Sequence, residues 1–423
     1  MAEIIRHPND TGLYSNISLG PTWFPARNKN ELQQGWEVQY KSLLKTFFKN
    51  DNSPYVIFMH VGSITYLENS KTIIPKKSKA LVDKKGLRIY LSDALSTYFI
   101  DDKTNSMYVD YEKEQEHLIR CKELDSISLY VKRNKLKNVS VFVPNYGAEH
   151  IFGKVYDNFQ IMCSPVGWIY PATIEIEAEV EHYTDKIKKH FWNGNWRYTS
   201  HRHILASYLA GKHLDTTNLS WLYESSDVDL IKHTWFQIDN LAEYKDIVLK
   251  GANTLSELSP ISMGIDVKNK LRIKEIPPFI HINTNPKEYY QDSFCAIVSE
   301  TRFADSTCLL TEKIMNAILN YRPFIMVGPP GNLKYMKRWG FETYNEFWDE
   351  SYDDETCHYK RMCKIFKLID DIASMSVKEI KQLHTEMYNT LSYNYFHILN
   401  LQEDLLETPI AKNKTFKKIR YAH

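Results

Sequence analysis

Residues 294–341 read as two strands, each followed by a helix, and this alternation constrains the fold more than any other stretch. Residues 294–298 (FCAIV) form a continuous apolar run, as expected of a strand buried on both faces. After a polar loop, apolar residues recur with the spacing of one helix face: Ile314, Ala317, Ile318 and Tyr321. Residues 324–327 (FIMV) predict a second strand, and Gly340 ends a second, short helix. The unit is therefore typical of an α/β sheet.

Polar residues follow the first of these strands at the edge where ligands bind in such sheets. Glu300 comes directly after the strand, and Thr311 stands as an N-cap before Glu312 and Lys313. A helix N-terminus and a lysine hold a diphosphate well, and a carboxylate accepts hydrogen bonds from ribose hydroxyls. The Gly-rich turn 328–332 would let backbone approach the same ligand. The alternative is that Glu300 and Glu312 are caps or ion-pair partners, since acids are common in first helical turns.

A second basic cluster precedes this unit. Arg197 and Arg202 flank the start of a helix predicted from Ser200 to Gly211, and a guanidinium binds phosphate through two points. We take both as candidates for a diphosphate. The alternative is that one of them pairs with residues 346–355, which carry six acids in ten positions.

The rest of the chain continues the α/β alternation. Strands are predicted at 55–60, 87–91, 139–143, 159–163 and 279–283, with a helix over 113–136. A tail beyond residue 356 is helical, with an apolar stripe formed by Cys363, Phe366, Leu368 and Ile369. With 423 residues the chain is long enough for two domains and a tail. We predict an N-terminal domain over 1–185, a second over 190–360, and C-terminal helices over 361–423.

The segment Thr311-Glu312-Lys313, followed by its amphipathic helix and residues 323–328 (PFIMVG), resembles the donor-binding motif of the α-1,3-fucosyltransferases. The resemblance implies that Glu312 contacts the donor ribose and that Lys313 faces the phosphates. Glu300 resembles the family's Glu in a Phe-Glu-Asn element. This chain has Ser-Glu-Thr there, which leaves the donor's sugar and base open.

This resemblance implies a GT-B glycosyltransferase. Such an α/β fold has two Rossmann-like domains with a cleft between them and a C-terminal helical tail that crosses back to the first domain. The first domain would bind the acceptor and the second a nucleotide-sugar donor. The nucleotide sugar is a co-substrate, and neither a cofactor nor a metal would be required, since Arg197, Arg202 and Lys313 would neutralise the leaving diphosphate.

Residues 340–353 resemble a segment of glycosyltransferase-like proteins from phages and large viruses. T-even-like phages carry glucosyl- or arabinosyltransferases that modify 5-hydroxymethylcytosine in their own DNA. Residues 41–90 hold ten Lys/Arg against three Asp/Glu, and 132–137 add a second basic run, so we prefer DNA as acceptor. The net charge of +1 favours the alternative, a fucosyltransferase-like enzyme acting on a glycan or polysaccharide. A third reading, a non-enzymatic binding protein on a glycosyltransferase scaffold, fits poorly with an intact Glu312-Lys313 pair.

An inverting transferase also needs a base that activates the acceptor hydroxyl. His60 and Asp93 both end predicted strands of the first domain and are our candidates, although a structural role is the alternative for each. Asp227 and Asp229 form a DxD pair at a predicted helix start, where aspartate caps are routine. His201, His203 and His358 are too scattered to predict a metal site.

Bulk features favour a cytoplasmic protein, in the host cytoplasm if it is viral. The six cysteines form no CxxC pair, which is typical of reduced thiols. The first ten residues lack the apolar stretch of a signal peptide, and no window predicts a membrane span. We expect a monomer or weak dimer.

Overall fold

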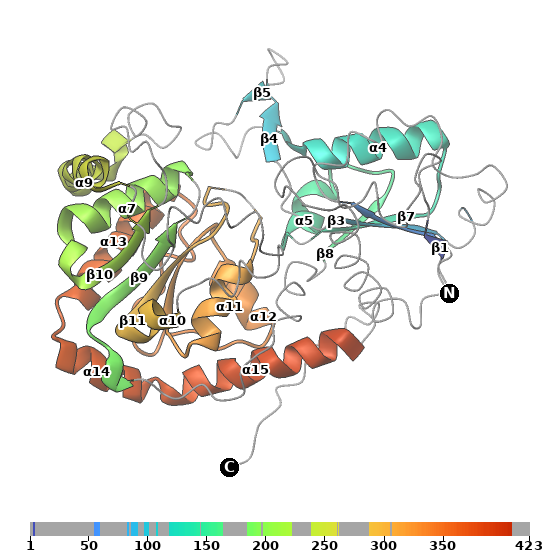
Figure 1. Ribbon diagram of the computed structural model, residues 1–423. Coiled ribbons are helices and arrows are strands. Elements are labelled where there is room, and N and C mark those ends of the chain that lie inside the picture. Colours follow the sequence, from blue (N-terminus) through green and yellow to red (C-terminus); the bar gives the residue numbers. More distant parts are fainter. Residues whose placement is uncertain are drawn as a thin grey trace, which may run out of the picture. The chain divides into compact units, whose positions relative to one another are not determined.

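The structure is a computed structural model, shown in Figure 1. It describes residues 3–4, 55–59, 83, 86–91, 97–100, 107–108, 118–143, 145–163, 184–195, 198–221, 238–259, 261, 287–304 and 307–407. The chain divides into two compact units, the first formed mainly by residues up to 173 and the second mainly by residues 174–400. Each unit contains a parallel sheet with helices, so the predicted α/β class is confirmed.

The first unit is built on a five-stranded parallel sheet in the order β1-β2-β3-β7-β8. Its strands are β1 (Glu3–Ile4), β2 (Tyr55–Met59), β3 (Leu87–Leu91), β7 (Val139–Val143) and β8 (Gln160–Cys163). The strands predicted at 55–60, 87–91, 139–143 and 159–163 are therefore confirmed within a residue or two. Along the chain, helix α5 (Ala148–Phe152) connects β7 to β8.

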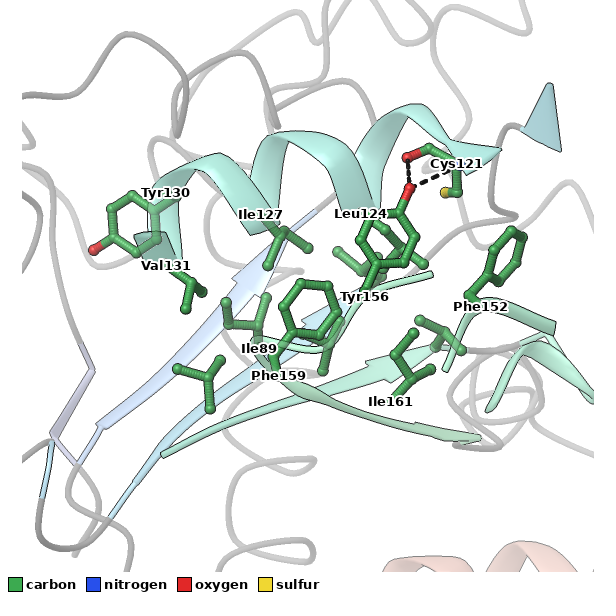
Figure 2. Close-up of a cluster of buried hydrophobic side chains, with 14 of the residues drawn as sticks. Ile89, Cys121, Leu124, Ile127, Tyr130, Val131, Phe152, Tyr156, Phe159 and Ile161 are labelled. Atoms are coloured by element: carbon green, nitrogen blue, oxygen red, sulfur yellow. Dashed lines mark hydrogen bonds between the residues drawn. The ribbon is translucent and has the colours of Figure 1, made fainter. Parts of the chain in front are cut away.

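Helix α4 (Lys122–Asn134) covers one face of this sheet and forms the unit's core with it (Figure 2). Leu124, Ile127 and Val131 recur on one side of the helix and are all buried. Tyr156 lies under the start of the helix, where its hydroxyl donates to Asp125 at 2.9 Å and contacts the backbone of Cys121. Burial of this ring raises its pKa. A single tyrosine thus fixes the first turn of the helix to the core.

The helix predicted over 113–136 is wrong in its first part. Residues Leu118–Cys121 form β6, which pairs antiparallel with β4 (Thr97–Ile100), and β5 (Met107–Tyr108) completes a three-stranded sheet. The chain becomes helical only at Lys122. Pairing with a strand some twenty residues earlier in sequence overrides local helical periodicity, because each residue of the ladder gains backbone hydrogen bonds.

The second unit is built on a four-stranded parallel sheet in the order β10-β9-β11-β12. Its strands are β9 (Lys189–Asn195), β10 (Thr217–Trp221), β11 (Ser293–Ser299) and β12 (Phe324–Val327). Strands β11 and β12 confirm the predictions at 294–298 and 324–327, and every residue of both is buried. The strand predicted at 279–283 lies outside the described residues.

Helices α7 (Ser200–Lys212) and α9 (Lys245–Leu258) pack together at two glycines. A Cβ on Gly251 would lie 1.7 Å from the carbonyl oxygen of Ser207, and one on Gly211 would lie 2.3 Å from that of Ile247. The two backbones are therefore in direct contact, which side chains would prevent.

The described part of the second unit contains five further helices: α10 (Lys287–Asp292), α11 (Glu312–Leu319), α12 (Asn332–Arg338), α13 (His358–Ala373) and α14 (Val377–Glu386). It also includes the part of α15 (Tyr388–Glu407) up to Asn400. Short 3-10 helices are η4 (Thr184–Lys186), η5 (Leu214–Thr216) and η6 (Ile238–Tyr244). The predicted stripe of the tail is confirmed, since Phe366, Leu368 and Ile369 of α13 are buried and Cys363 is half-buried.

All six cysteines are free. Among the helices that the structure describes, none is long and apolar enough to cross a membrane.

Candidate functional site

The second sheet has a topological switch point between β9 and β11. The chain leaves β9 through α7 and continues to β10 at one edge, whereas it leaves β11 through α11 and continues to β12 at the other. Connections that diverge in this way open a crevice outside the carboxyl ends of the two central strands, where ligands of open α/β sheets bind. The residues that follow Asn195 and Ser299 therefore border the candidate site.

Three of the candidate side chains meet at this edge. Glu300 is fully buried, and its two carboxylate oxygens accept hydrogen bonds from the Thr311 backbone N–H at 3.1 Å and from the Thr311 hydroxyl at 2.6 Å. Lys313 Nζ donates to Thr311 Oγ1 at 3.0 Å. The structure thus places a carboxylate, a hydroxyl and an ammonium in one chain of contacts at the start of α11.

Thr311 is the N-cap of α11, as the sequence predicted, and its side chain accepts from the backbone N–H of Lys313 at 3.5 Å. The apolar face predicted for this helix is buried throughout: Ile314, Ala317, Ile318 and Tyr321. Because Glu300 holds the cap residue by two hydrogen bonds, this buried carboxylate orients the N-terminus of the helix. Glu312 is the first residue of α11, and its side chain lies outside the described part of the structure.

Arg202 binds the backbone at the end of β11. Its Nη2 donates to the carbonyl oxygens of Ser299 and Glu300, each at 3.1 Å, and the residue is 5% exposed. His201 Nε2 donates to the same Glu300 carbonyl at 3.0 Å, which fixes the tautomer of the ring because a carbonyl can only accept. Two side chains of α7 therefore anchor the carboxyl end of β11.

The loop after β11 is fixed from a second side by α13. The His201 ring stacks on Phe303 with 5.4 Å between ring centroids, and the Arg361 guanidinium lies 4.4 Å above the centroid of the same Phe303 ring. Arg361 also donates to the carbonyl oxygen of Phe303. The residues that border the switch point are consequently held in one geometry before any ligand arrives.

We expect His201 to make the protein less stable in mild acid. Burial, reinforced by the charge of Arg202, lowers its pKa from 6.5 to about 3, so between these values only the unfolded chain binds the proton. The free energy that the neutral His201 contributes to stability is therefore fully present above pH 6.5. It falls as the pH drops towards 3, by about 1.4 kcal/mol per pH unit. Urea unfolding at pH 6.5 and pH 5 should differ by about 2 kcal/mol from this residue. An equally steep pH dependence in His201→Gln would contradict the assignment.

Two buried amides at this edge were not predicted as site residues. Asn195, at the end of β9, is 2% exposed; its Nδ2 donates to Asn193 at 2.5 Å, while its Oδ1 has no hydrogen-bond partner within the described residues. Asn332, at the start of α12, is fully buried, and neither polar atom of its amide has a partner in the same part of the chain. A buried amide without partners is costly, and a bound ligand is one way in which it is satisfied.

The turn 328–332, predicted to let backbone approach a ligand, leads into a helix whose first backbone N–H groups are already bound within the protein. The N-terminal amides of α12 are occupied by Asp353, whose carboxylate accepts from the backbone N–H of Leu333 at 3.0 Å and of Lys334 at 3.2 Å. Gly328 is required because the Asn332 side chain packs on it, and a Cβ there would lie 2.2 Å from the amide nitrogen. An internal carboxylate, placed by the loop that precedes α13, takes the position expected for a ligand anion.

The remaining candidates do not join this cluster. Arg197, His60, Asp93, Asp227 and Asp229 lie outside the described residues. His203 stacks on Trp221 with centroids 5.1 Å apart, and burial lowers its pKa to about 4, as expected of a core histidine. His358 is also buried. Among the residues that the structure places, no three His, Cys, Asp or Glu side chains gather as a metal site would require.

Comparison with known proteins adds little to this geometry. No protein-family model matches the chain, and no curated protein matches it. A solved structure described as trehalose-6-phosphate from E. coli bound with UDP-2-fluoro glucose aligns with 12% identity over 88% of this chain and 78% of that chain. Its TM-score of 0.36 is too low for the likeness to carry an argument about this chain.

Proposed function

We propose that the protein is a glycosyltransferase with a GT-B architecture and that it binds a nucleotide-sugar donor at the carboxyl edge of the β10-β9-β11-β12 sheet. The observation that carries the proposal is the Glu300–Thr311–Lys313 chain of contacts at the start of α11, beside the switch point. A helix N-terminus with a lysine suits a diphosphate. Near this edge, Asn195 Oδ1 and both polar atoms of the Asn332 amide have no hydrogen-bond partner within the described residues, which is consistent with a ligand that satisfies them.

The described contacts divide the candidates into two roles. Lys313 is half-exposed and can turn its ammonium from Thr311 to a phosphate oxygen, so it is the residue that would bind the donor. Glu300 and Arg202 are positioning residues, because their polar groups hold the cap of α11 and the end of β11. By resemblance, Glu312 would contact the ribose and Arg197 the diphosphate.

The reaction proposed is a displacement at the anomeric carbon of the donor sugar. The acceptor hydroxyl oxygen forms a bond to that carbon while the bond from the carbon to the diphosphate oxygen breaks, and the nucleoside diphosphate leaves. In an inverting enzyme a base takes the hydroxyl proton, the role for which Asp93 and His60 are the candidates. Lys313 and the basic residues near it would stabilise the negative charge that grows on the leaving group.

For the acceptor we retain DNA carrying 5-hydroxymethylcytosine, modified by arabinosyl or glucosyl transfer. The end of α4 supports it, because Lys132, Arg133, Lys135 and Lys137 are all exposed on one short stretch. Cations at a helix C-terminus are also favoured by the helix dipole, which is the structural alternative. The competing proposal is a glycan acceptor, favoured by the net charge of +1.

A gel-shift assay with hydroxymethylcytosine DNA separates these acceptors. If DNA is the acceptor, binding should weaken steeply between low and moderate salt, because bound phosphates release counterions. A glycan enzyme should show no such binding at either salt concentration. DNA that binds equally at both would contradict an electrostatic DNA track.

Thermal unfolding in the presence of nucleotide sugars tests the donor proposal. A ligand that binds only the folded state raises its stability by RT ln(1 + [L]/Kd), or about 2.7 kcal/mol at one hundred times Kd. We expect one of UDP-glucose, UDP-arabinose, GDP-fucose and ADP-glucose to raise the Tm clearly, and its free nucleoside diphosphate to raise it less. If no nucleotide or nucleotide sugar shifts the Tm, the chain is better described as a degenerate scaffold without donor binding.

A further inference from the structure

A cavity lies in the second unit, between α12 and the segment 343–354. It encloses about 470 Å³, within the roughly 300–1,000 Å³ range of small-molecule sites. Its lining is formed by Leu333, Lys334, Lys337, Asn345, Trp348, Asp349, Glu350, Ser351, Asp353 and Asp354. The lining includes none of Glu300, Thr311 and Lys313, whose contacts carry the donor proposal.

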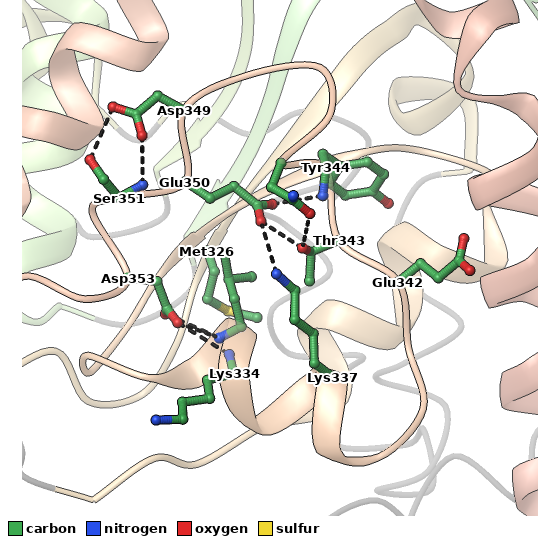
Figure 3. A network of polar contacts seen from close by, with 12 residues as sticks. Met326, Lys334, Lys337, Glu342, Thr343, Tyr344, Asp349, Glu350, Ser351 and Asp353 are labelled. Carbon is green, nitrogen blue, oxygen red and sulfur yellow. Dashed lines mark hydrogen bonds and ion pairs between the residues drawn. The ribbon is translucent and has the colours of Figure 1, made fainter. Parts of the chain in front are cut away.

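Two of the lining carboxylates, Asp353 and Glu350, are held by hydrogen bonds within the protein (Figure 3). Asp353 is 7% exposed and is held by the backbone N–H groups of Leu333 and Lys334. The Glu350 carboxylate accepts from the Thr343 hydroxyl at 2.6 Å and from the Tyr344 backbone N–H at 2.7 Å. Burial raises the pKa of both carboxyls, but each is satisfied inside the protein, so neither needs a ligand cation.

Most of the charged side chains that line the cavity already bind other groups of the protein. Asp349 is occupied by the backbone and hydroxyl of Ser351, at 2.8 and 3.0 Å. Lys337 lies 3.9 Å from Glu350. Of the charged lining groups in the described structure, only Lys334 and Asp354 then have side chains without an ion pair or hydrogen bond, and both are exposed. Lys334 and Asp354 are therefore the charged side chains of the lining that are left to bind a ligand.

Trp348 supplies an aromatic surface. Its ring contacts Tyr344, with centroids 5.2 Å apart, and the edge of Phe294, with centroids 6.4 Å apart, so its orientation is fixed. The indole N–H is buried and has no acceptor among the residues placed by the structure. A rigid ring beside free donors and acceptors packs well against a ligand that has both a C–H face and hydroxyls.

We propose that this cavity binds a neutral carbohydrate, with the sugar hydroxyls meeting Asp354, Lys334 and Asn345 and a C–H face packing on Trp348. Each hydroxyl both donates and accepts, which matches a wall that offers a carboxylate, an ammonium and an amide. The lining carries four carboxylates and two ammonium groups, so charge repels a phosphate, while a cation meets Lys334 and Lys337 and finds three of the carboxylates already hydrogen-bonded within the protein. The site goes beyond donor binding and would hold a saccharide other than the donor.

Saturation-transfer NMR with glucose, galactose, mannose, maltose and lactose tests the proposal on the full chain. We expect at least one sugar to give a saturation-transfer signal. Asp354→Ala should lower the affinity for that sugar at least fivefold. Glu346→Ala is the matched control, because Glu346 is an exposed acid of the same segment that does not line the cavity. Trp348→Phe, which reduces the aromatic surface on which the C–H face packs, should weaken the same signal.

Three results would overturn this inference: no sugar binds, Asp354→Ala binds as the parent protein does, or inorganic phosphate or spermidine binds this cavity more tightly than every sugar. Failure here is distinguishable from failure of the donor proposal, since donor binding is measured by thermal unfolding with nucleotide sugars. Asp354→Ala should leave that thermal shift unchanged.

Discussion

Replacing Gly251 with alanine is expected to lower the free energy of unfolding of the second unit by about 3 kcal/mol, near the upper end for an overpacked core. The added Cβ would lie 1.7 Å from the Ser207 carbonyl oxygen and 2.6 Å from the Gly211 backbone nitrogen. Both atoms belong to the backbone of α7, so no side-chain rotation relieves the overlap, and the two helices must separate. Denaturant unfolding followed by circular dichroism measures the loss.

Asn253→Ala provides the control for this prediction. Asn253 is an exposed residue of the same helix, and alanine has a higher helix propensity than asparagine. The free energy of unfolding of Asn253→Ala should therefore stay within about 0.5 kcal/mol of the parent value or rise slightly. Equal midpoints for Gly251→Ala and the parent would show that α7 and α9 do not touch in solution. That result would also remove the basis for placing Arg202 and His201 at the end of β11, since both belong to α7.

The unit 294–341 was predictable because each of its signals is local. A strand of a parallel sheet is buried on both faces, so β11 and β12 are unbroken apolar runs that can be recognised without knowing their neighbours. Thr311 caps its own helix, and Gly340, with φ of 90°, ends α12 by adopting a conformation that favours glycine. Such features can be predicted from the residue type and its neighbours in the sequence.

Strand β9 was missed because its sequence does not resemble a buried strand. Residues 189–195 read KHFWNGN, and the two asparagines suggest a loop. The structure buries them by pairing across strands: Asn193 Nδ2 donates to the Ile297 carbonyl oxygen at 2.8 Å, and Asn195 donates to Asn193. The partner lies 104 positions along the chain, so only tertiary structure reveals that these polar residues belong to the sheet.

The role of Glu300 illustrates the same limit within the candidate site. Its position after a strand predicted the edge of the sheet, but the sequence left open whether it binds a ligand or a cap. The structure places both carboxylate oxygens on Thr311, eleven residues later. The Asp353 carboxylate at the start of α12, some twenty residues distant, could not be anticipated from a turn that reads as a phosphate loop.

Lys313→Ala is expected to reduce affinity for the nucleotide sugar at least about 100-fold, because a charge-assisted contact between an ammonium and a diphosphate is worth roughly 3 kcal/mol. The fold should be little affected. The residue is half-exposed, and the cap residue Thr311 keeps both of its hydrogen bonds to Glu300 when the ammonium is removed. Titration calorimetry with the nucleotide sugar that gives the largest thermal shift measures the change.

Lys360→Ala, an exposed lysine of α13 outside this edge, is the control for a general loss of positive charge and should bind as the parent does. Lys313→Arg separates charge from geometry: it keeps the cation, so a partial recovery of affinity would indicate that the ammonium acts on phosphate. Should the alanine variant bind with unchanged affinity and unchanged Tm, Lys313 would have no part in donor binding. The proposal would then lose the ammonium that the structure places on the Thr311 hydroxyl at the start of α11.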